Sequence, residues 1–335
     1  MNFLILLFGL ALLVVGGELV VTNGVRVAEH FRISPMIIGL TVVAIGTSLP
    51  ELAVGIDGMR RGVGDIVLGN VVGTDIVNIL LILGLSALIR PIAVPPGILK
   101  IDLPMMTISS AFFLFLAWNG YLGVTDGIIL LVAGIIYMTF VLVTARRRDL
   151  GEGTIESPDA ASSALNHADE MELAESVSLK SAPKPLWLTI LLLVIGLAGI
   201  VYGADRMLSG AVAIAQQFGV SETLIGLTIV AIGTSAPELV TTIIATIKNE
   251  RGLAFGNLVG SSTLNLTIIL GLSLLFTPYS IAVNPSLLRV SMPLMVLVGL
   301  ACVPVFLSGR RMSRLEGGLF VAAYAVYLTY TLVSV

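Results

Sequence analysis

Long apolar stretches recur along the chain, and short polar segments separate them. About 20 consecutive apolar residues are enough for a helix to cross the hydrocarbon core of a bilayer. This pattern predicts spanning helices at residues 2–23, 34–59, 65–89, 102–119, 122–145, 186–209, 221–247, 252–277, 288–308 and 314–334. The expected fold is therefore an all-α polytopic membrane protein with ten transmembrane helices.

Composition supports a membrane protein and excludes several other classes. The 335 residues are 56% hydrophobic and only 12% charged, whereas soluble domains carry about 25% charged residues. A cluster of basic and aromatic residues, as nucleic-acid binding requires, is missing from the sequence. The lone cysteine, Cys302, cannot form an internal disulfide or a thiolate metal site. We expect neither an enzyme nor a bound cofactor, and no nucleic-acid partner.

The distribution of Lys and Arg predicts the orientation in the membrane. The loops that follow the odd-numbered spans hold 14 of the 18 basic residues. The opposite side holds the other four, Arg60, Arg61, Arg206 and Arg289. Cytoplasmic loops are rich in Lys and Arg, so the first set is expected in the cytoplasm and both termini outside the cell.

Residues 149–185 differ from the rest of the chain in composition. Eight Asp and Glu residues stand there among Ser and Ala, with almost no aromatic residue. A regulatory ion site is one alternative, but the acids lack the spacing of an EF-hand loop. We interpret the segment as a solvated cytoplasmic linker between two five-helix halves, residues 1–148 and 186–335.

The two halves contain an internal repeat. A shift of 187 residues places Gly39–Ser86 on Gly226–Ser273 without a gap, and 23 of these 48 positions are identical. Upstream the same register places Glu18 on Asp205. Because each half has an odd number of predicted spans, the second half would enter the membrane from the opposite side. Inverted repeats of this kind place substrate sites near the middle of the membrane, at interrupted helices from each half.

The most similar stretches of the repeat are AIGTSLPEL, which starts at Ala44, and AIGTSAPELV, which starts at Ala231. Each places a glutamate, Glu51 or Glu238, inside an apolar segment, where an ionisable residue is costly and usually functional. Pro50 and Pro237 remove a helical N–H. With the help of Gly46, the first helix should kink or unwind at Ala44–Ser48, and Gly233 should help the second copy to do the same. Backbone carbonyls freed in this way persist at membrane depth only beside a cavity, another helix or an ion.

Each copy offers a set of hard oxygen ligands. The residues expected on one face are Thr47, Ser48 and Glu51 in the first copy, and Thr234, Ser235 and Glu238 in the second. The following helices add Thr74 and Asn78 in one half, and Ser261 and Asn265 in the other. Glycines precede each second set, Gly69 and Gly73, then Gly256 and Gly260, and they would allow close helix contact. The alternative for these Asn and Ser side chains is ordinary interhelical hydrogen bonding.

Two carboxylates and several neutral oxygens match what Ca²⁺ prefers, which is six to eight oxygen ligands. Soft ligands are missing from the set, which argues against transition metals. The same oxygens could hold Na⁺ when Ca²⁺ is absent, so the two ions would compete. Without a cation the carboxylates would repel each other and favour proton uptake, which leaves proton exchange open.

The stretches GTSLPEL and GNVVGTDIVN, with GTSAPELV and GNLVGSSTLN, resemble the two alpha-repeats of the calcium/cation antiporter superfamily. Within it, the chain is most similar to prokaryotic sodium/calcium exchangers, over essentially its whole length. The resemblance implies exchange of Ca²⁺ for Na⁺ by alternating access, with the first and sixth helices sliding across the rest.

By position, the resemblance also implies a role for each site residue. Glu51 and Glu238 would bind both Ca²⁺ and Na⁺; Thr47 and Thr234 would give backbone and hydroxyl oxygens, and Ala44 and Ala231 carbonyl oxygens; Ser48, Ser235, Thr74 and Ser261 would line flanking Na⁺ sites; Asn78 and Asn265 would hold the middle. Two positions depart from the family pattern. Some members carry an aspartate at the position of Asn265, and an amide is usual at that of Asp75, whose side chain is expected to point away from the site. Asp57, which Ile244 replaces in the repeat, is expected near a helix end rather than among the ligands.

The leading hypothesis is therefore a secondary antiporter in the cell membrane that exchanges Na⁺ for Ca²⁺. A proton/Ca²⁺ antiporter on the same scaffold is the first alternative, and a passive cation channel is a second from another class. A structural or receptor membrane protein has no support beyond the linker. We expect a functional monomer.

Overall fold

Helices make up nearly all of the chain that the structure describes. The computed structural model describes residues 2–93, 101–151, 185–219, 231–307 and 311–333. The first half contains α1 (Asn2–Phe31), α2 (Pro35–Ile38), α3 (Ala44–Thr47), α4 (Leu49–Arg60), α5 (Gly64–Ile76), α6 (Gly84–Ile89), α7 (Leu103–Ala117) and α8 (Val124–Gly151). The second half contains α11 (Leu186–Gln217), α13 (Ala231–Thr234), α14 (Ala236–Ile247), α15 (Arg251–Leu264), α16 (Leu270–Leu274), α17 (Met292–Leu307) and α18 (Arg314–Val333).

The described helices agree with a multi-pass membrane protein. Seven are long and apolar enough to cross a membrane, or eight if the bent pair Pro35–Thr47 and Leu49–Arg60 is one span. Leu103–Ala117 and Ala236–Ile247 are apolar but shorter. Helices cover most of the described part of each of the ten predicted ranges. Residues 221–230 of the seventh range and most of the predicted linker lie outside the described residues.

Three helices are longer than the sequence pattern predicts, and one of them, α8, ends at Gly151 rather than near residue 145. α1 continues to Phe31 rather than ending near residue 23, and α11 continues to Gln217 rather than ending near residue 209. Val27 and Ala28 are buried in the extended part of α1, so packing against the protein continues past the apolar stretch. Arg26, which the charge count assigned to a loop, therefore lies within the helix.

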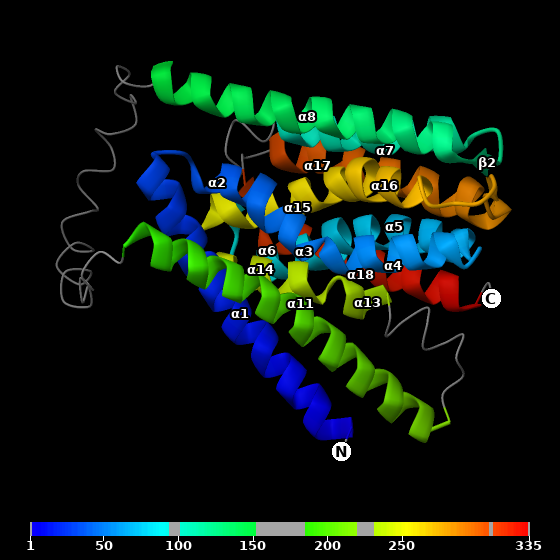
Figure 1. Ribbon diagram of the computed structural model, residues 1–335, viewed down its shortest axis with the longest axis horizontal. Helices are drawn as coiled ribbons and strands as arrows, with labels where there is room; N and C mark the ends of the chain where they lie inside the picture. The colour runs from blue at the N-terminus through cyan, green and yellow to red at the C-terminus, as the bar shows by residue number, and fades with distance from the viewer. Residues whose placement is uncertain (1, 94–100, 152–184, 220–230, 308–310, 334–335) are drawn as a thin grey trace.

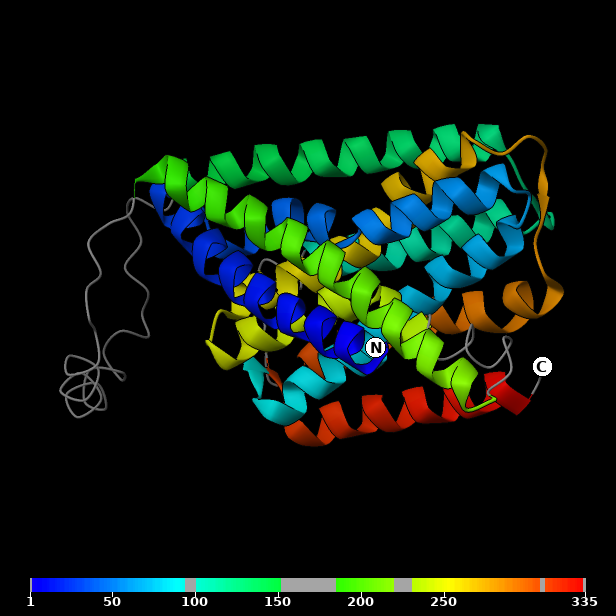
Figure 2. The ribbon, with the colours of Figure 1, turned by 60° about the horizontal axis from the view of Figure 1, so that its bottom comes forward.

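α1 and α11 form a tightly packed antiparallel pair. Gly9 lies opposite Gly203, and Gly16 lies opposite Gly196. A Cβ atom added at Gly196 would lie 3.0 Å from the carbonyl oxygen of Gly16, so the backbones touch where these glycines meet. The pair runs obliquely across the other helices, with α8 on one side of the bundle and α18 on the other (Figures 1 and 2). Because the contact is largely backbone against backbone, the two helices are suited to act as one unit.

The best-buried helices are the ones that carry the second set of predicted site residues. In the span Arg251–Leu274, 94% of the apolar window is buried, and in Gly64–Ile89 the share is 72%. The corresponding share is 28% for Leu186–Gln217 and 17% for Arg314–Val333, whose large apolar side chains are mostly exposed or half-buried. Exposed apolar side chains around a buried polar centre are the arrangement that lipid solvation requires.

Three helical pairs are joined through π-helical segments, and a fourth such segment precedes α17. These are η1 (Gly39–Val43), η2 (Val77–Leu83), η6 (Asn265–Ile269) and η7 (Leu287–Ser291). η1 leads directly into α3 and the first glutamate motif, while η2 and η6 begin at Val77 and Asn265. π-Helical turns within α-helices are frequent at functional sites. The sequence pattern did not predict them.

Two short antiparallel ladders connect loops of the two halves. β1 (Ile92–Ala93) pairs with β4 (Arg311–Met312), and β2 (Tyr121–Leu122) pairs with β3 (Ile281–Ala282). Each ladder joins one strand from the first half to one from the second. The halves are therefore interlocked by backbone hydrogen bonds as well as by helix packing.

Candidate cation site

The first predicted break is present and lies at Ser48. The helix bends by 41° between Pro35–Thr47 and Leu49–Arg60, and Ser48 has φ −86° and ψ 4°, outside the helical range. Pro50 stands in the first turn of α4, where its missing N–H is tolerated. The break thus follows from the proline, as expected, and places the start of a new helix inside the membrane span.

The second copy breaks in the same way. Ser235 has φ −84° and ψ 5°, nearly the values of Ser48, and Pro237 stands in the first turn of α14. The structure therefore contains two interrupted helices with matching local geometry. The part of the second helix before Ala231 lies outside the described residues.

The two glutamates lie in the first turns of the new helices. Glu51 is 1% exposed and Glu238 is fully buried, and the two carboxyl groups are close enough to interact electrostatically. Within the described residues, neither carboxylate oxygen of either side chain has a hydrogen-bond partner. A helix N-terminus favours a negative charge, but burying two unpaired carboxylates is still costly. A cation between them would offset that cost.

Hydroxyl groups from both halves surround Glu238. Its carboxyl group lies beside the hydroxyls of Thr47, Ser48 and Ser261. Thr47 Oγ1 is 3.3 Å from Ser261 Oγ, and Thr47, Ser48 and Ser261 are completely buried. The first half's helix break and the second half's α15 therefore contribute to one polar centre.

The remaining predicted residues lie on elements that pack around this centre. Asn78, in η2, lies on a segment in contact with α14, which carries Glu238. Asn265 begins η6, which contacts α4, the helix of Glu51. The side-chain polar atoms of these two residues, and of Ser48, Ser235 and Thr74, are buried without a hydrogen-bond partner in the described part of the chain. Buried polar atoms in native proteins nearly always have partners, so this concentration indicates a ligand site.

The remaining predicted ligands are Ala44, Thr234 and Ala231. Ala44 is fully buried at the start of α3, and its carbonyl oxygen is 3.4 Å from Thr47 Oγ1. Thr234 is buried and donates a hydrogen bond to Asn70 Oδ1, at 3.4 Å. Ala231 begins α13, and its burial is outside what the structure describes.

Asn70 and Asn257 contact the predicted site residues, although the sequence pattern did not indicate them. Thr47 Oγ1 donates to Asn257 Oδ1 at 3.2 Å, so each asparagine accepts a hydrogen bond from the helix-break threonine of the opposite half. Asn257 Nδ2 also donates to Thr242 Oγ1 at 3.2 Å. The two asparagines are equivalent under the 187-residue register, within the GN pair that both copies share. That shared pair was the available signal, but the sequence did not show what it contacts.

Asp75 and Asp57, the two aspartates that were not predicted as ligands, have different surroundings. Asp75 is 1% exposed and lies beside the hydroxyl of Ser262, its own counterpart in the repeat. Asp57 forms an exposed ion pair with Arg61, 2.8 Å between Oδ2 and Nε, near the end of α4. The prediction that Asp57 lies near a helix end is therefore correct.

The glycines that precede the second polar sets differ between the halves. A Cβ atom at Gly256 or Gly260 would collide with backbone atoms of residues 36–40, which confirms close helix contact in the second half. Gly69 and Gly73 have no described atom within 4 Å of such a Cβ. The residues that the register would place against them, 223–227, lie outside the described residues.

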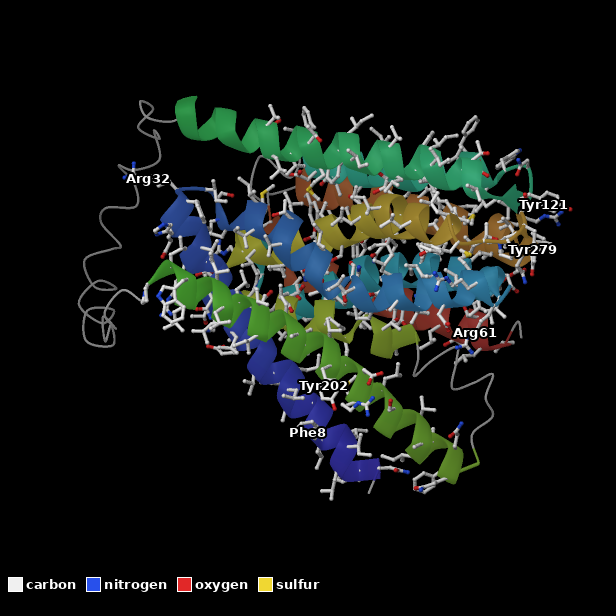
Figure 3. All side chains as sticks on the ribbon, in the orientation of Figure 1. Phe8, Arg32, Arg61, Tyr121, Tyr202 and Tyr279 are labelled. Atoms are coloured by element: carbon white, nitrogen blue, oxygen red, sulfur yellow. The ribbon has the colours of Figure 1, made fainter. Side chains whose placement is uncertain are left out.

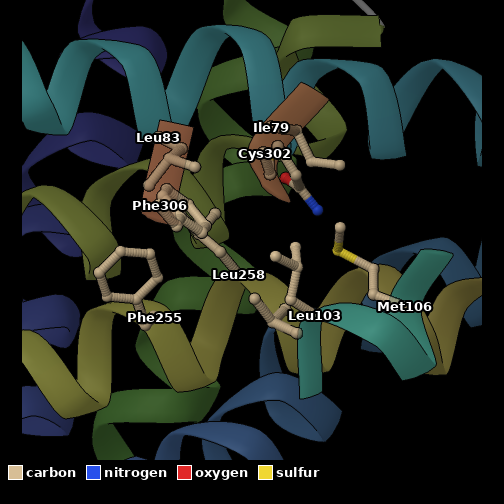
Figure 4. Close-up of a pocket in the computed structure, with 10 residues that line it drawn as sticks. Ile79, Leu83, Leu103, Met106, Phe255, Leu258, Cys302 and Phe306 are labelled. Atoms are coloured by element: carbon tan, nitrogen blue, oxygen red, sulfur yellow. The ribbon is translucent and has the colours of Figure 1, made fainter. Parts of the chain in front are cut away.

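Next to Asn78 lies a small cavity with apolar walls (Figure 4). It has a volume of about 10 Å³, little more than one water molecule needs, and lies between α7, α15, α17 and the α5–η2 helix. Its lining includes Leu103, Met106, Phe255 and Phe306, and Asn78 is the one lining residue with a polar side chain other than the thiol of Cys302. An apolar wall of this kind does not bind ions, so the cavity does not extend the polar centre.

Taken together, the donor set selects hard cations. Two carboxylates supply two negative charges, and the surrounding donors are hydroxyl, amide and backbone oxygens. Among the described residues, no group of three or more His, Cys, Asp and Glu side chains could hold a metal ion. This arrangement matches one divalent ion or several monovalent ones, and it contains none of the soft ligands that transition metals prefer.

Comparison with known proteins agrees with this chemistry. The family model described as sodium/calcium exchanger protein matches residues 1–143 and 188–333. The sodium/calcium exchanger MaX1 of Methanosarcina acetivorans is 33% identical, over 98% of this chain and 97% of its own length. The putative antiporter CaxA of Alkalimonas amylolytica is also 33% identical, over 96% and 95%. The inner membrane protein YrbG of Escherichia coli K12 is 36% identical, over 82% of this chain and 79% of its own.

Solved structures of the sodium-calcium exchanger NCX_Mj have the same fold. One, from crystals soaked with 10 mM Na⁺ and no Ca²⁺, superimposes with a TM-score of 0.79 at 30% identity and covers 98% of both chains. The fold, the buried oxygen ligands and the match over both halves lead to one conclusion: this multi-pass membrane protein belongs to the sodium/calcium exchanger family of cation antiporters.

Proposed function

We propose that this protein is a secondary active antiporter that exchanges Na⁺ for Ca²⁺ across the cell membrane by alternating access. The observation that carries the proposal is the pair Glu51 and Glu238. Both carboxylates are buried, they interact with each other, and neither has a hydrogen-bond partner in the described chain. Na⁺ and Ca²⁺ are close in size and share oxygen ligands, so one centre can hold either and the two compete.

In this proposal the ligands come from both halves. Glu51 and Glu238 neutralise Ca²⁺, and the hydroxyl, amide and carbonyl oxygens complete its coordination. The neutral ligands are Thr47, Thr234, Ser48, Ser235, Thr74, Ser261, Asn78, Asn265, Ala44 and Ala231. Na⁺ ions occupy the same centre and its flanks when Ca²⁺ leaves. The transported ions are substrates, and the mechanism requires no further cofactor.

The proposal also includes the topology. Residues 1–148 and 186–335 form two inverted five-helix halves, ten spans in all, and residues 149–185 link them in the cytoplasm. Both termini then lie outside the cell, and a single chain is sufficient for transport. The similar geometry of the two helix breaks supports the inverted arrangement, because equivalent sequences adopt equivalent conformations in both halves.

A gradient-swap flux assay tests the proposal. Purified protein in proteoliposomes loaded with Na⁺ is diluted into Na⁺-free medium that contains ⁴⁵Ca²⁺, at equal pH on both sides. We expect Ca²⁺ uptake that disappears when the Na⁺ concentration is equal across the membrane. Uptake that follows a pH gradient and ignores Na⁺ would instead establish proton/Ca²⁺ exchange. Flux that needs no counter-ion would identify a channel.

A further inference from the structure

A network of ionic and polar contacts ties α1 to the end of α14. Lys248, directly after α14, forms an ion pair with Glu18 of α1 and donates a hydrogen bond to Thr22 Oγ1 at 3.0 Å. Glu18 and Thr22 lie one turn apart on α1 and are 3.4 Å from each other. The contact therefore joins the α1–α11 pair to the part of the molecule that carries Glu238.

The internal repeat contains the same chemistry a second time. The 187-residue register places Glu18 on Asp205, Thr22 on Ser209, and Arg61 on Lys248. Thus α11 carries an acid and a hydroxyl one turn apart, as α1 does. A basic residue follows α4, as one follows α14. The repeat predicts a contact between Arg61 and Asp205 that mirrors the contact between Lys248 and Glu18.

In this structure the mirrored contact is not formed. Arg61 pairs with Asp57 on its own helix, 2.8 Å from Nε to Oδ2. Asp205 pairs with the adjacent Arg206, whose guanidinium lies 5.3 Å from the ring centre of Tyr202. Figure 3 shows Arg61 at the end of α4 and Tyr202 on α11.

The partners that replace the mirrored contact are not part of the repeat. Asp57 falls on Ile244, and Arg206 falls on Leu19. Two equivalent charge sets are therefore present: Lys248 and Glu18 are joined, whereas Arg61 and Asp205 each pair with a local partner. Lys248 also has a second acid nearby, Glu250. Burial and the charge of Glu29 raise the pKa of Glu250, and Lys248 acts in the opposite direction.

In a protein built from inverted repeats, the difference between the two charge sets is related to the conformational change. When such halves exchange conformations, the molecule changes from access at one membrane face to access at the other. A contact that only one of two equivalent sets makes in one state is then made by the other set in the opposite state. The joined and separated charge sets have this relationship to each other.

We propose that Glu18–Lys248 and Asp205–Arg61 are two alternately closing ionic latches. The first holds the α1–α11 pair in the present state, and the second holds it in the state open to the opposite face. The inference rests on the proposed exchange by alternating access between inverted halves. In the proposed topology Lys248 is cytoplasmic and Arg61 is extracellular, so the present state is latched at the cytoplasmic face.

Each ionic latch shifts the equilibrium between the two states and does not hold the protein permanently in one of them. The side chains of Lys248 and Glu18 are 34% and 52% exposed, and exposed ion pairs are individually weak. Removing one latch should change the ratio of the two states by about two- to fivefold. A carrier needs this range, because a stronger contact would trap it on one side.

Cysteine cross-linking tests the proposal in proteoliposomes. The parent carries Cys302→Ala, and one variant adds Asp205→Cys with Arg61→Cys. A short bifunctional methanethiosulfonate reagent should cross-link this pair only when the second latch is closed. Adding Lys248→Ala should raise the initial cross-linking rate about two- to fivefold, because the first latch no longer opposes the change. Lys248→Arg, which keeps the charge, should leave the rate unchanged.

A second pair of variants separates electrostatics from misfolding. Glu18→Lys alone should raise the cross-linking rate, and combining it with Lys248→Glu should return the rate to that of the parent, because the ion pair is restored with reversed polarity. Cross-linking that fails under every ion gradient, or that ignores Lys248→Ala, overturns the latch.

The same vesicles distinguish this outcome from failure of the proposed function. If cross-linking alternates but Ca²⁺ uptake follows protons rather than Na⁺, the latches stand and the Na⁺ coupling is wrong. If Na⁺-driven Ca²⁺ uptake is normal and the cross-links do not alternate, the latches are wrong and the transport function stands.

Discussion

Asn257 should contribute far more to stability than its repeat counterpart Asn70. Asn257 is fully buried, accepts a hydrogen bond from Thr47 and donates one to Thr242, both at 3.2 Å. Asn70 is only partly buried and, within the described residues, makes one hydrogen bond, at 3.4 Å with Thr234. The register explains the difference, because the position equivalent to Thr242 is Gly55, which has no hydroxyl.

The magnitude follows from these contacts. A net hydrogen bond contributes about 0.5–1.5 kcal/mol, and stranding a buried partner adds to its loss. Two such bonds, with the space that truncation leaves, give about 2–4 kcal/mol for Asn257→Ala. Asn70→Ala should cost less than about 1 kcal/mol, since one long contact is lost at a partly exposed position.

The assay is unfolding in mixed micelles by titration with sodium dodecyl sulfate, followed by circular dichroism. A double-mutant cycle of Asn257→Ala and Thr242→Val isolates one hydrogen bond, because valine keeps the shape of threonine and removes the hydroxyl. The coupling energy should be about 1 kcal/mol. Additive effects within about 0.3 kcal/mol, or an equal cost for Asn70→Ala, would refute the reasoning.

Three further predictions concern transport and packing. Glu51→Gln should lower the apparent affinity for Ca²⁺ at least about 100-fold in the proteoliposome assay, because it removes half of the compensating charge. The exposed Glu29→Gln is the matched control, and normal transport by the Glu51 variant would remove that carboxylate from the site. Gly203→Ala should destabilise the protein by about 1–3 kcal/mol, because its Cβ would lie 2.9 Å from the carbonyl oxygen of Gly9. Gly199→Ala should be nearly neutral on the same helix, where the nearest atom is 3.8 Å away, and equal melting temperatures would contradict the packing argument. Deleting residues 152–184 behind a short flexible linker should leave Na⁺-driven Ca²⁺ uptake intact, and loss of uptake in correctly inserted protein would show that the segment is more than a linker.

Much of the fold could be predicted from local sequence. The cost of exposing backbone polar groups to lipid requires helices of a certain length, and apolar windows of that length are visible in the sequence. Pro50 acts on its own helix, so the break at Ser48 was also predictable, to within a few residues. Local windows gave poorer boundaries for α1 and α11, because each helix continues past its apolar stretch with residues that are buried against other helices, such as Val27, Ala28 and Ala215.

The site was predictable in part. The doubled motif indicated the two glutamates and their neighbouring hydroxyls as site residues, because an acid that is repeated inside the membrane is seldom there for packing alone. It did not give the crossed contacts of Asn70 and Asn257, because each joins residues from different halves. It also did not give the π-helical turns at Val77 and Asn265, which depend on how neighbouring helices pack.

The sequence by itself shows that this protein lies in a lipid bilayer and that its chain contains a twofold repeat. It also shows where the two helix breaks and the neighbouring glutamates lie. These properties follow from lipid solvation and from proline geometry, which act over one or two turns of chain. Only the tertiary structure decided which half supplies the partner of each threonine. It also decided that Lys248 is joined to Glu18 while the equivalent Arg61 is not joined to Asp205. The repeat gives both halves equivalent charged residues, so the register alone cannot show which set is joined; the difference arises from how the α1–α11 pair sits against the remaining helices.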